Sequence, residues 1–238
     1  ECLDALAERD VKAIVVACNT STAVALPLLR RRYALPILGV VRPGATAAVL
    51  ATRTRAVGVI ATPATVRSHA YFEAINEEDP FVEVFEHATP ELVPLVEAGK
   101  LQGPAVDAAI RRSLAPLLGD AVQADPSFVF PKPLDARIDT LLLGCTHYPL
   151  LSEAIRGIVG PGTAVIDSAT ATASALASLL EVHDLGTPDT APGQHLLLTT
   201  GDVAAFEATS TRLFDAGLGE IEPIVLGRAA GGVTGGSA

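Results

Sequence analysis

Short apolar runs alternate with helical stretches along most of the chain, and this alternation restricts the fold more than any other feature. Seven runs have the length and composition of strands, and a helical stretch follows most of them. The runs are rich in Val and Leu without polar alternation, which indicates strands buried on both faces of a parallel sheet. The sequence therefore predicts an α/β protein whose largely parallel sheets are flanked by helices.

The expected elements can be placed by residue range. The expected strands are 13–17, 37–41, 57–61, 81–86, 140–143, 164–166 and 196–199. The expected helices are 2–9, 21–32, 44–52, 65–76, 104–117, 150–159, 170–182 and 202–214. Residues 119–133 carry Gly, Pro and Asp in place of either pattern, and we expect a surface loop or insertion there.

Composition excludes several classes of partner. Of the 238 residues 49% are hydrophobic and 18% charged, which is typical of a globular chain, and no apolar run reaches the roughly 18 residues that span a bilayer. The net charge of −10 opposes binding to phosphate backbones or anionic lipid. We therefore expect neither a nucleic acid nor a membrane as a partner.

Two of the expected strands end on a cysteine. Cys18 is followed by Asn19, Thr20 and a helix, and Cys145 is followed by Thr146, His147 and a helix. Ligands of open α/β sheets bind at the carboxyl ends of the strands, where helix N-termini offer free N–H groups and a partial positive charge. Such an environment, with His147 nearby, is expected to lower the pKa of a thiol toward neutrality.

A pair of thiols at matched positions suits one kind of chemistry. Inverting a stereocentre next to a carboxylate needs a base on one face of the carbon and an acid on the other. A third strand end, in GVIATPATVRSHAY, adds Thr62 and Thr65 to the same edge. Their hydroxyls are as well suited to capping the next helix as to binding a ligand.

Cofactor chemistry has no visible support in the sequence. A pyridoxal enzyme needs a Lys for its Schiff base, and Lys12, Lys100 and Lys132 lie at a strand start and in loops. No spacing of His and Cys suggests a metal site, and three widely spaced cysteines suggest no disulfide framework. We expect no cofactor and a reducing, cytoplasmic environment.

Several segments resemble bacterial glutamate racemases. VVACNTSTAVALPLLRRRYALPILGVVRPG, VGVIATPATVRSHAY, DTLLLGCTHYPLL and TTGDVAAFEATSTRLF are similar to motifs of that family, and GCTHYPL is highly specific. The resemblance implies cofactor-independent conversion of L- to D-glutamate for peptidoglycan biosynthesis, with glutamate as the substrate and a homodimer among the expected assemblies. It also implies two α/β domains, one from residues 1–41 with 167–238 and one from 42–166, with the active site in the cleft between them.

The resemblance also assigns roles to residues. Cys18 is expected to be the base for the D-isomer and Cys145 the base for the L-isomer, assisted by His147. The remaining polar residues at the strand ends are expected to bind the substrate: Asn19, Thr20, Thr62, Thr65 and Thr146.

One departure from the family pattern affects the interpretation. An Asp-Ser-Gly-Val-Gly-Gly motif and a Pro-Tyr-Gly motif, which the family carries near its N-terminus, do not occur in this sequence. We therefore expect an N-terminally truncated chain that is inactive or poorly folded in isolation, although the full-length parent is expected to be an enzyme, a glutamate racemase. Two alternatives stay open: a related aspartate or hydantoin racemase, and a binding or regulatory homologue without turnover.

Overall fold

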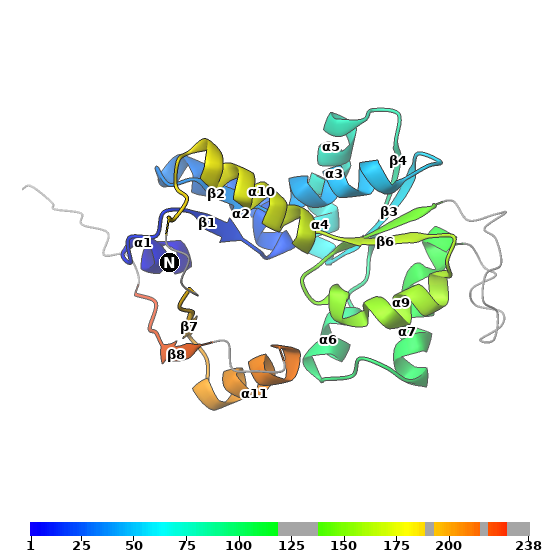
Figure 1. Cartoon of the computed structure of the whole chain (residues 1–238). Helices are drawn as coiled ribbons and strands as arrows, with labels where there is room; N and C mark the ends of the chain where they lie inside the picture. The colour runs from blue at the N-terminus through cyan, green and yellow to red at the C-terminus, as the bar shows by residue number, and fades with distance from the viewer. Residues whose placement is uncertain (119–137, 189–192, 215–218, 228–238) are drawn as a thin grey trace, which may run out of the picture. The chain divides into compact units, whose positions relative to one another are not determined.

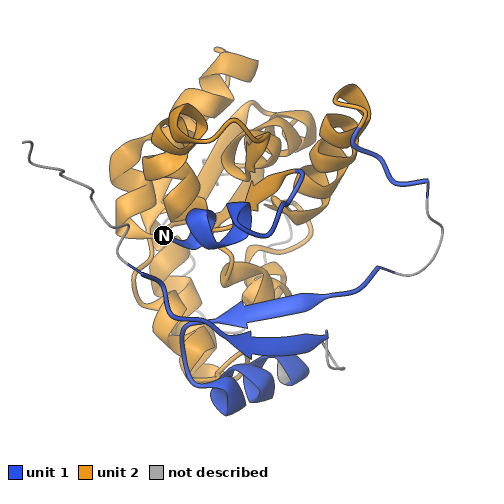
Figure 2. Cartoon of the chain, turned by 90° about the vertical axis from the view of Figure 1, so that its left-hand side faces the viewer, with its two compact units in different colours: residues 1–12, 185–238 blue, residues 13–184 orange. Residues whose placement is uncertain are grey.

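A computed structural model describes residues 1–118, 138–188, 193–214 and 219–227. Contacts divide the chain into two compact units, coloured in Figure 2: Glu1–Lys12 with Leu185–Ala238, and Ala13–Asp184. The predicted loop at 119–133 lies outside the described residues.

The first unit holds a small parallel sheet. Strands β7 (Leu196–Thr199) and β8 (Glu220–Pro223) pair in parallel, and helices α1 (Cys2–Ala7) and α11 (Val203–Phe214) belong to the same unit. β8 was not predicted, because the sequence EIEP has only one large apolar residue.

The second unit holds two parallel sheets (Figure 1). β1 (Ile14–Val16) pairs with β2 (Ile37–Gly39), and a four-stranded sheet has the order β4-β3-β5-β6. Its strands are β3 (Ala56–Ala61), β4 (Glu83–Ala88), β5 (Thr140–Gly144) and β6 (Ala164–Asp167). Every pairing in this sheet is parallel, which confirms the predicted fold class.

Helices cover both faces of the four-stranded sheet (Figure 1). One face carries α3 (Val41–Ala51) and α5 (Ala70–Glu78), and the other carries α7 (Pro104–Leu118) and α9 (Ser152–Val159). The remaining elements of this unit are α2 (Asn19–Arg32), α4 (Pro63–Ser68), α6 (Leu92–Glu97), the 3₁₀ helix η1 (Tyr148–Leu151) and α10 (Ala169–Val182).

Alternate side chains of the central strands enter two separate cores. Leu142 of β5 packs with α3 and α5, whereas Leu141 and Leu143 pack with α7 and α9. All three are buried, since a strand points successive side chains to opposite faces of its sheet. This explains why the central strand sequences show no polar alternation.

The structure differs from the expected elements in several places. The expected helix 65–76 is two helices, because His69 adopts a left-handed conformation with φ 54° and ends α4 where α5 begins. Helix α6 was not predicted. The strand expected to reach residue 41 stops at Gly39, and α3 starts at Val41.

The domain division stays a prediction. The sheet of β1 and β2 is separate from the four-stranded sheet, as the predicted boundary between residues 41 and 42 requires. The compact units, however, change at residues 12/13 and 184/185, because α10 packs on α3 and β2 and so joins both sheets in one unit.

Candidate active site

Cys18 lies at the N-terminus of a long helix. It is the N-cap residue of α2, in an extended conformation, and the backbone N–H of Ser21 donates to its Sγ atom at 3.5 Å. The residue is exposed. The first turn of a helix leaves backbone N–H groups without an intrahelical partner, and a helix N-terminus is a favourable place for a negatively charged group.

Cys145 lies in a different environment at the end of β5. It is only 6% exposed, and the short helix η1 follows it after two residues. The Sγ atom is 3.7 Å from Nδ1 of His147. Burial raises the pKa of the Cys145 thiol, against smaller opposing contributions from the backbone N–H groups of His147 and Tyr148. The expectation of a lowered pKa is therefore wrong for this thiol, because desolvation disfavours the charged form.

The two thiols interact electrostatically. The charge of Cys18 also raises the pKa of Cys145, which shows that the two sulfurs lie close enough to affect each other. A negative charge on Cys18 thus favours a proton on Cys145. One thiolate and one thiol is the combination that a base and an acid on opposite sides of a carbon require.

His147 also contacts a carboxylate. Its Nε2 atom is 2.5 Å from Oε1 of Glu97, at the end of helix α6, and its Nδ1 atom faces Cys145. Imidazole nitrogens on opposite sides of the ring thus connect the thiol to the carboxylate. Such a connection fixes the orientation of the ring and allows a proton to move to or from the sulfur.

Three threonine hydroxyls come together from two strand ends. Thr20 Oγ1 is 2.8 Å from Thr62 Oγ1 and 3.0 Å from Thr65 Oγ1, and the last two are 3.0 Å apart. Thr62 also accepts from the backbone N–H of Thr65 at 3.3 Å, which makes it the N-cap of α4. Thr62 thus both caps a helix and joins the hydroxyl cluster, so the two interpretations of this residue coexist.

The other two predicted binding residues differ in exposure. Asn19 is buried, and its Nδ2 atom donates to the hydroxyl of Tyr71 at 2.6 Å. Thr146 is exposed beside His147, with its Oγ1 atom 3.5 Å from Nδ1 of that ring. The second unit thus supplies every predicted site residue.

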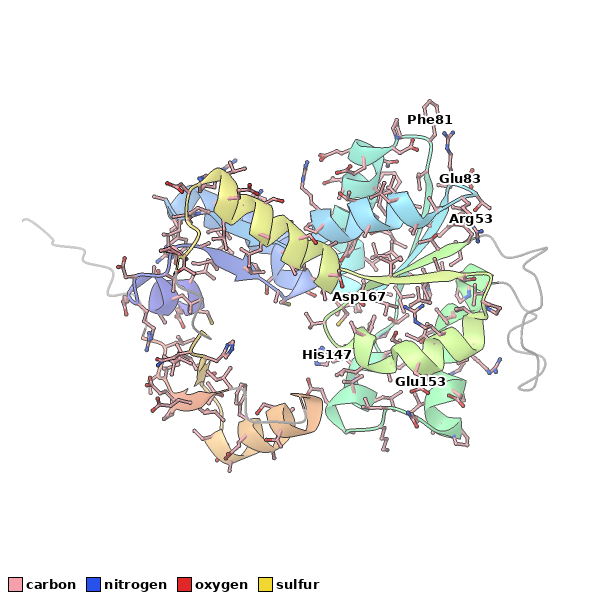
Figure 3. The ribbon with its side chains drawn as sticks, viewed as in Figure 1. Arg53, Phe81, Glu83, His147, Glu153 and Asp167 are labelled. Carbon is pink, nitrogen blue, oxygen red and sulfur yellow. The ribbon has the colours of Figure 1, made fainter. Side chains whose placement is uncertain are left out.

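A cavity of about 350 Å³ adjoins Cys145. Its lining includes Thr146, Asp167, Ser168 and Thr172 among mainly apolar side chains. Asp167 Oδ1 accepts from the backbone N–H of Ala169 at 2.8 Å, so this carboxylate binds the first turn of α10, whereas the Ser168 side chain makes no cap bond. Figure 3 shows His147 and Asp167 at one end of the four-stranded sheet, and Arg53 and Glu83 at the other.

The described ranges contain neither a candidate metal site nor a helix that could span a membrane. They contain no group of three His, Cys, Asp or Glu side chains arranged to hold a metal ion. No helix among them is long and apolar enough to cross a membrane.

Comparison with known proteins identifies the family. A family model described as Asp/Glu/Hydantoin racemase matches residues 1–125. A glutamate racemase from Shouchella clausii is 42% identical over 202 residues, which make up 85% of this chain and 67% of that protein. The chain belongs to the Asp/Glu/Hydantoin racemase family.

Solved structures of racemases agree with this membership. A glutamate racemase isoform from Bacillus anthracis has a TM-score of 0.84 at 33% identity, covering 94% of this chain and 78% of that one. A glutamate racemase from Francisella tularensis, in complex with D-glutamate, has a TM-score of 0.78 at 28% identity, covering 92% and 76%.

Two residues that contact the predicted site residues were not predicted from the sequence. Glu97 ends the apolar segment LVPLVE, 50 residues before His147, and no spacing in the sequence connects the two. Tyr71, in HAYFEAI, has the spacing of a core aromatic residue, and it is one. Only the fold brings its hydroxyl to Asn19.

Proposed function

We propose that this chain interconverts L- and D-glutamate without a cofactor, with Cys18 and Cys145 as two bases that act on opposite faces of the α-carbon. The observation that carries the proposal is the pair of free thiols that follow two strand ends, close enough for the charge of Cys18 to contribute to the raised pKa of Cys145. The glutamate racemases among its relatives supply the substrate class.

The reaction needs only proton transfers. One thiolate removes the α-proton, so that the Cα–H bond breaks, an S–H bond forms and the electron pair passes into the substrate carboxylate. The opposite thiol donates its proton to the other face of the carbon and becomes a thiolate. The enzyme then carries its proton on the other sulfur, and exchange with solvent, through His147 on the Cys145 side, restores the starting state.

The polar residues at the strand ends are proposed to hold the substrate. Asn19, Thr20, Thr62, Thr65 and Thr146 offer amide and hydroxyl groups to the ammonium and carboxylate groups, which places the α-carbon between the sulfurs. Glu97 is proposed to orient His147 beside Cys145. In this assignment Cys18 removes the proton of the D-isomer and Cys145 that of the L-isomer.

The cellular setting completes the proposal. D-glutamate made by this reaction is proposed to enter peptidoglycan biosynthesis in the cytoplasm, where a reducing environment keeps both thiols free. A homodimer stays a prediction.

Proton exchange in D₂O tests the function. Purified chain incubated with L-glutamate is expected to replace the α-proton by deuterium, seen by NMR, while the optical rotation decays to zero. L-Aspartate in a parallel reaction tests the alternative that the family description raises, a racemase for another amino acid. Turnover of aspartate in preference to glutamate would reassign the substrate, and glutamate binding without exchange would make the chain a binding protein.

A further inference from the structure

Tyr71 connects the surroundings of both thiols. It lies on α5, is completely buried, and its hydroxyl accepts the Asn19 Nδ2 hydrogen bond of 2.6 Å, 52 residues away in sequence. Asn19 is the residue directly after Cys18. The hydroxyl therefore contacts the side chain of the residue next to the first thiol.

The ring of Tyr71 contacts the segment that carries the second thiol. A Cβ atom on Gly144, the residue directly before Cys145, would lie 2.9 Å from Tyr71 Cε2, which is closer than real Cβ contacts come. Gly144 thus lacks a side chain where the tyrosine ring occupies the space. The same aromatic side chain therefore abuts β5 at its end and binds the start of α2.

Burial keeps the hydroxyl neutral. Desolvation, with a smaller contribution from the charge of Cys145, raises the pKa of Tyr71 well above its ordinary value. A neutral hydroxyl can hold the amide of Asn19 through every protonation state of the thiols. A hydroxyl that stays neutral has no charged form with which to accept a proton, so we assign Tyr71 no step of proton transfer.

We propose that Tyr71 is a positioning residue for the racemization: its hydroxyl fixes the Asn19 amide, and its ring fixes the distance between the two strand ends. The inference rests on the proposed function, in which Asn19 binds the substrate. With Nδ2 held by Tyr71, the amide presents its Oδ1 atom as the acceptor for the substrate ammonium group. Loss of the hydroxyl frees the amide to rotate, which weakens substrate binding more than the chemical step.

Tyr148 provides a matched control. It too is completely buried, its pKa is also raised by burial and by Cys145, and its hydroxyl is also hydrogen-bonded. Its partners differ: it donates to the backbone carbonyl of Thr89 at 3.0 Å and accepts from Thr89 Oγ1 at 2.7 Å. Removing this hydroxyl costs a similar buried hydrogen bond without affecting Asn19.

The experiment compares Tyr71→Phe and Tyr148→Phe, each alone and with Asn19→Ala. Racemization gives KM and kcat in both directions, calorimetry gives the dissociation constant for glutamate, and thermal unfolding checks folding. We expect Tyr71→Phe to raise KM and the dissociation constant about threefold to tenfold, the value of one hydrogen bond, with kcat nearly unchanged. We expect Tyr148→Phe to lower stability and leave KM unchanged.

The double variants decide whether Tyr71 acts through Asn19. If it does, Tyr71→Phe has no further effect on KM once Asn19 is Ala, because the residues are coupled. An equal penalty in both backgrounds, or an equal rise in KM in Tyr148→Phe, would overturn the proposal. A wild-type chain that binds glutamate without racemizing it overturns the proposed function alone, since the binding constants still test Tyr71. A chain that neither binds nor racemizes glutamate overturns both.

Discussion

Cys18 and Cys145 occupy the same place in two strand–helix units, yet their environments differ in almost every physical respect. Cys18 is exposed at the start of a 14-residue α-helix whose N–H group donates to its sulfur. Cys145 is buried, precedes a four-residue 3₁₀ helix, and faces an imidazole. The difference shows that the same position after a strand does not give the same environment, and at Cys145 burial raises the pKa more than the nearby backbone N–H groups lower it.

The comparison also extends to the residues that precede the thiols. Ala17, before Cys18, is exposed, whereas Gly144, before Cys145, faces the Tyr71 ring. Cys18 thus follows a solvent-exposed residue, whereas Cys145 follows a residue that is closely packed against an aromatic ring. This difference between the two thiols can be tested by substitutions at Cys18, Cys145, Gly144 and Glu97.

Replacing either thiol is expected to have the largest effect. Cys18→Ser and Cys145→Ser should each reduce racemization by about 100-fold or more, because serine is far too weak an acid to replace a positioned thiol. Exchange of the α-proton in D₂O, followed separately for each isomer, measures the bias. Cys18→Ser should abolish exchange of the D-isomer and leave slow exchange of the L-isomer, and Cys145→Ser should do the reverse. Equal losses for both isomers in both variants would contradict the two-base assignment.

Adding one methyl group beside Cys145 is expected to destabilise the fold. In Gly144→Ala the new Cβ would lie 2.9 Å from Tyr71 Cε2 and 3.0 Å from the backbone oxygen of Ile60, which cannot move aside freely. We expect a loss of about 1–3 kcal/mol in the free energy of unfolding, measured in urea.

The control for this variant is Gly157→Ala on α9. No atom lies within 4 Å of its added Cβ, and alanine is the better helix former, so we expect a gain of up to about 1 kcal/mol. A loss as large as that of Gly144→Ala would show that the close contact with Tyr71 is not the cause.

The pH dependence of alkylation separates the two contributions to the acidity of Cys145. Because its pKa is raised, Cys145 should react with iodoacetamide only at higher pH than free cysteine does, as followed by peptide mass spectrometry. Cys18→Ser should shift the Cys145 profile to lower pH without reaching that of free cysteine, since burial is the larger cause. A profile unaffected by Cys18→Ser would show that the sulfurs are not coupled.

The same shift has a consequence for stability. The folded chain keeps the Cys145 proton at a pH where the unfolded chain, with a thiol pKa of about 8.5, loses it. The stability that this group contributes is therefore complete below that pH and is lost as the pH rises through the raised value. Cys145→Ser should flatten this alkaline decline in urea unfolding experiments.

Neutralising Glu97 is expected to have the smallest effect. The Glu97 side chain is 67% exposed, so solvent screens its attraction for His147, and Glu97→Gln should slow L-isomer exchange by about twofold to fivefold. D-isomer exchange should change less, because Cys18 does not depend on His147. Glu153→Gln removes an equal charge on α9 and serves as the control. Identical effects from both variants would assign the loss to overall charge.

Much of the fold could be predicted from the sequence because its signals are local. Val- and Leu-rich runs predict buried strands, and all seven predicted strands occur, with ends shifted by a few residues. Two features could not be predicted in this way. The break between α4 and α5 depends on the conformation of a single residue, His69, and β8 is too polar to have the pattern of a buried strand. The grouping of Thr20, Thr62 and Thr65 was predictable, since these residues come shortly after strands of parallel sheets. Thr146 lies apart from them, beside His147.

The sequence by itself determined the fold class, the two thiols and the family, because strand ends followed by polar residues and a helix form a local pattern. Only the tertiary structure decided what surrounds each thiol. The contact of Glu97 with His147 joins residues 50 positions apart, and the hydrogen bond of Tyr71 to Asn19 joins residues 52 positions apart. Cys145 is buried in a core that several helices and strands build together, and the acidity of a thiol depends on that surrounding dielectric and charge.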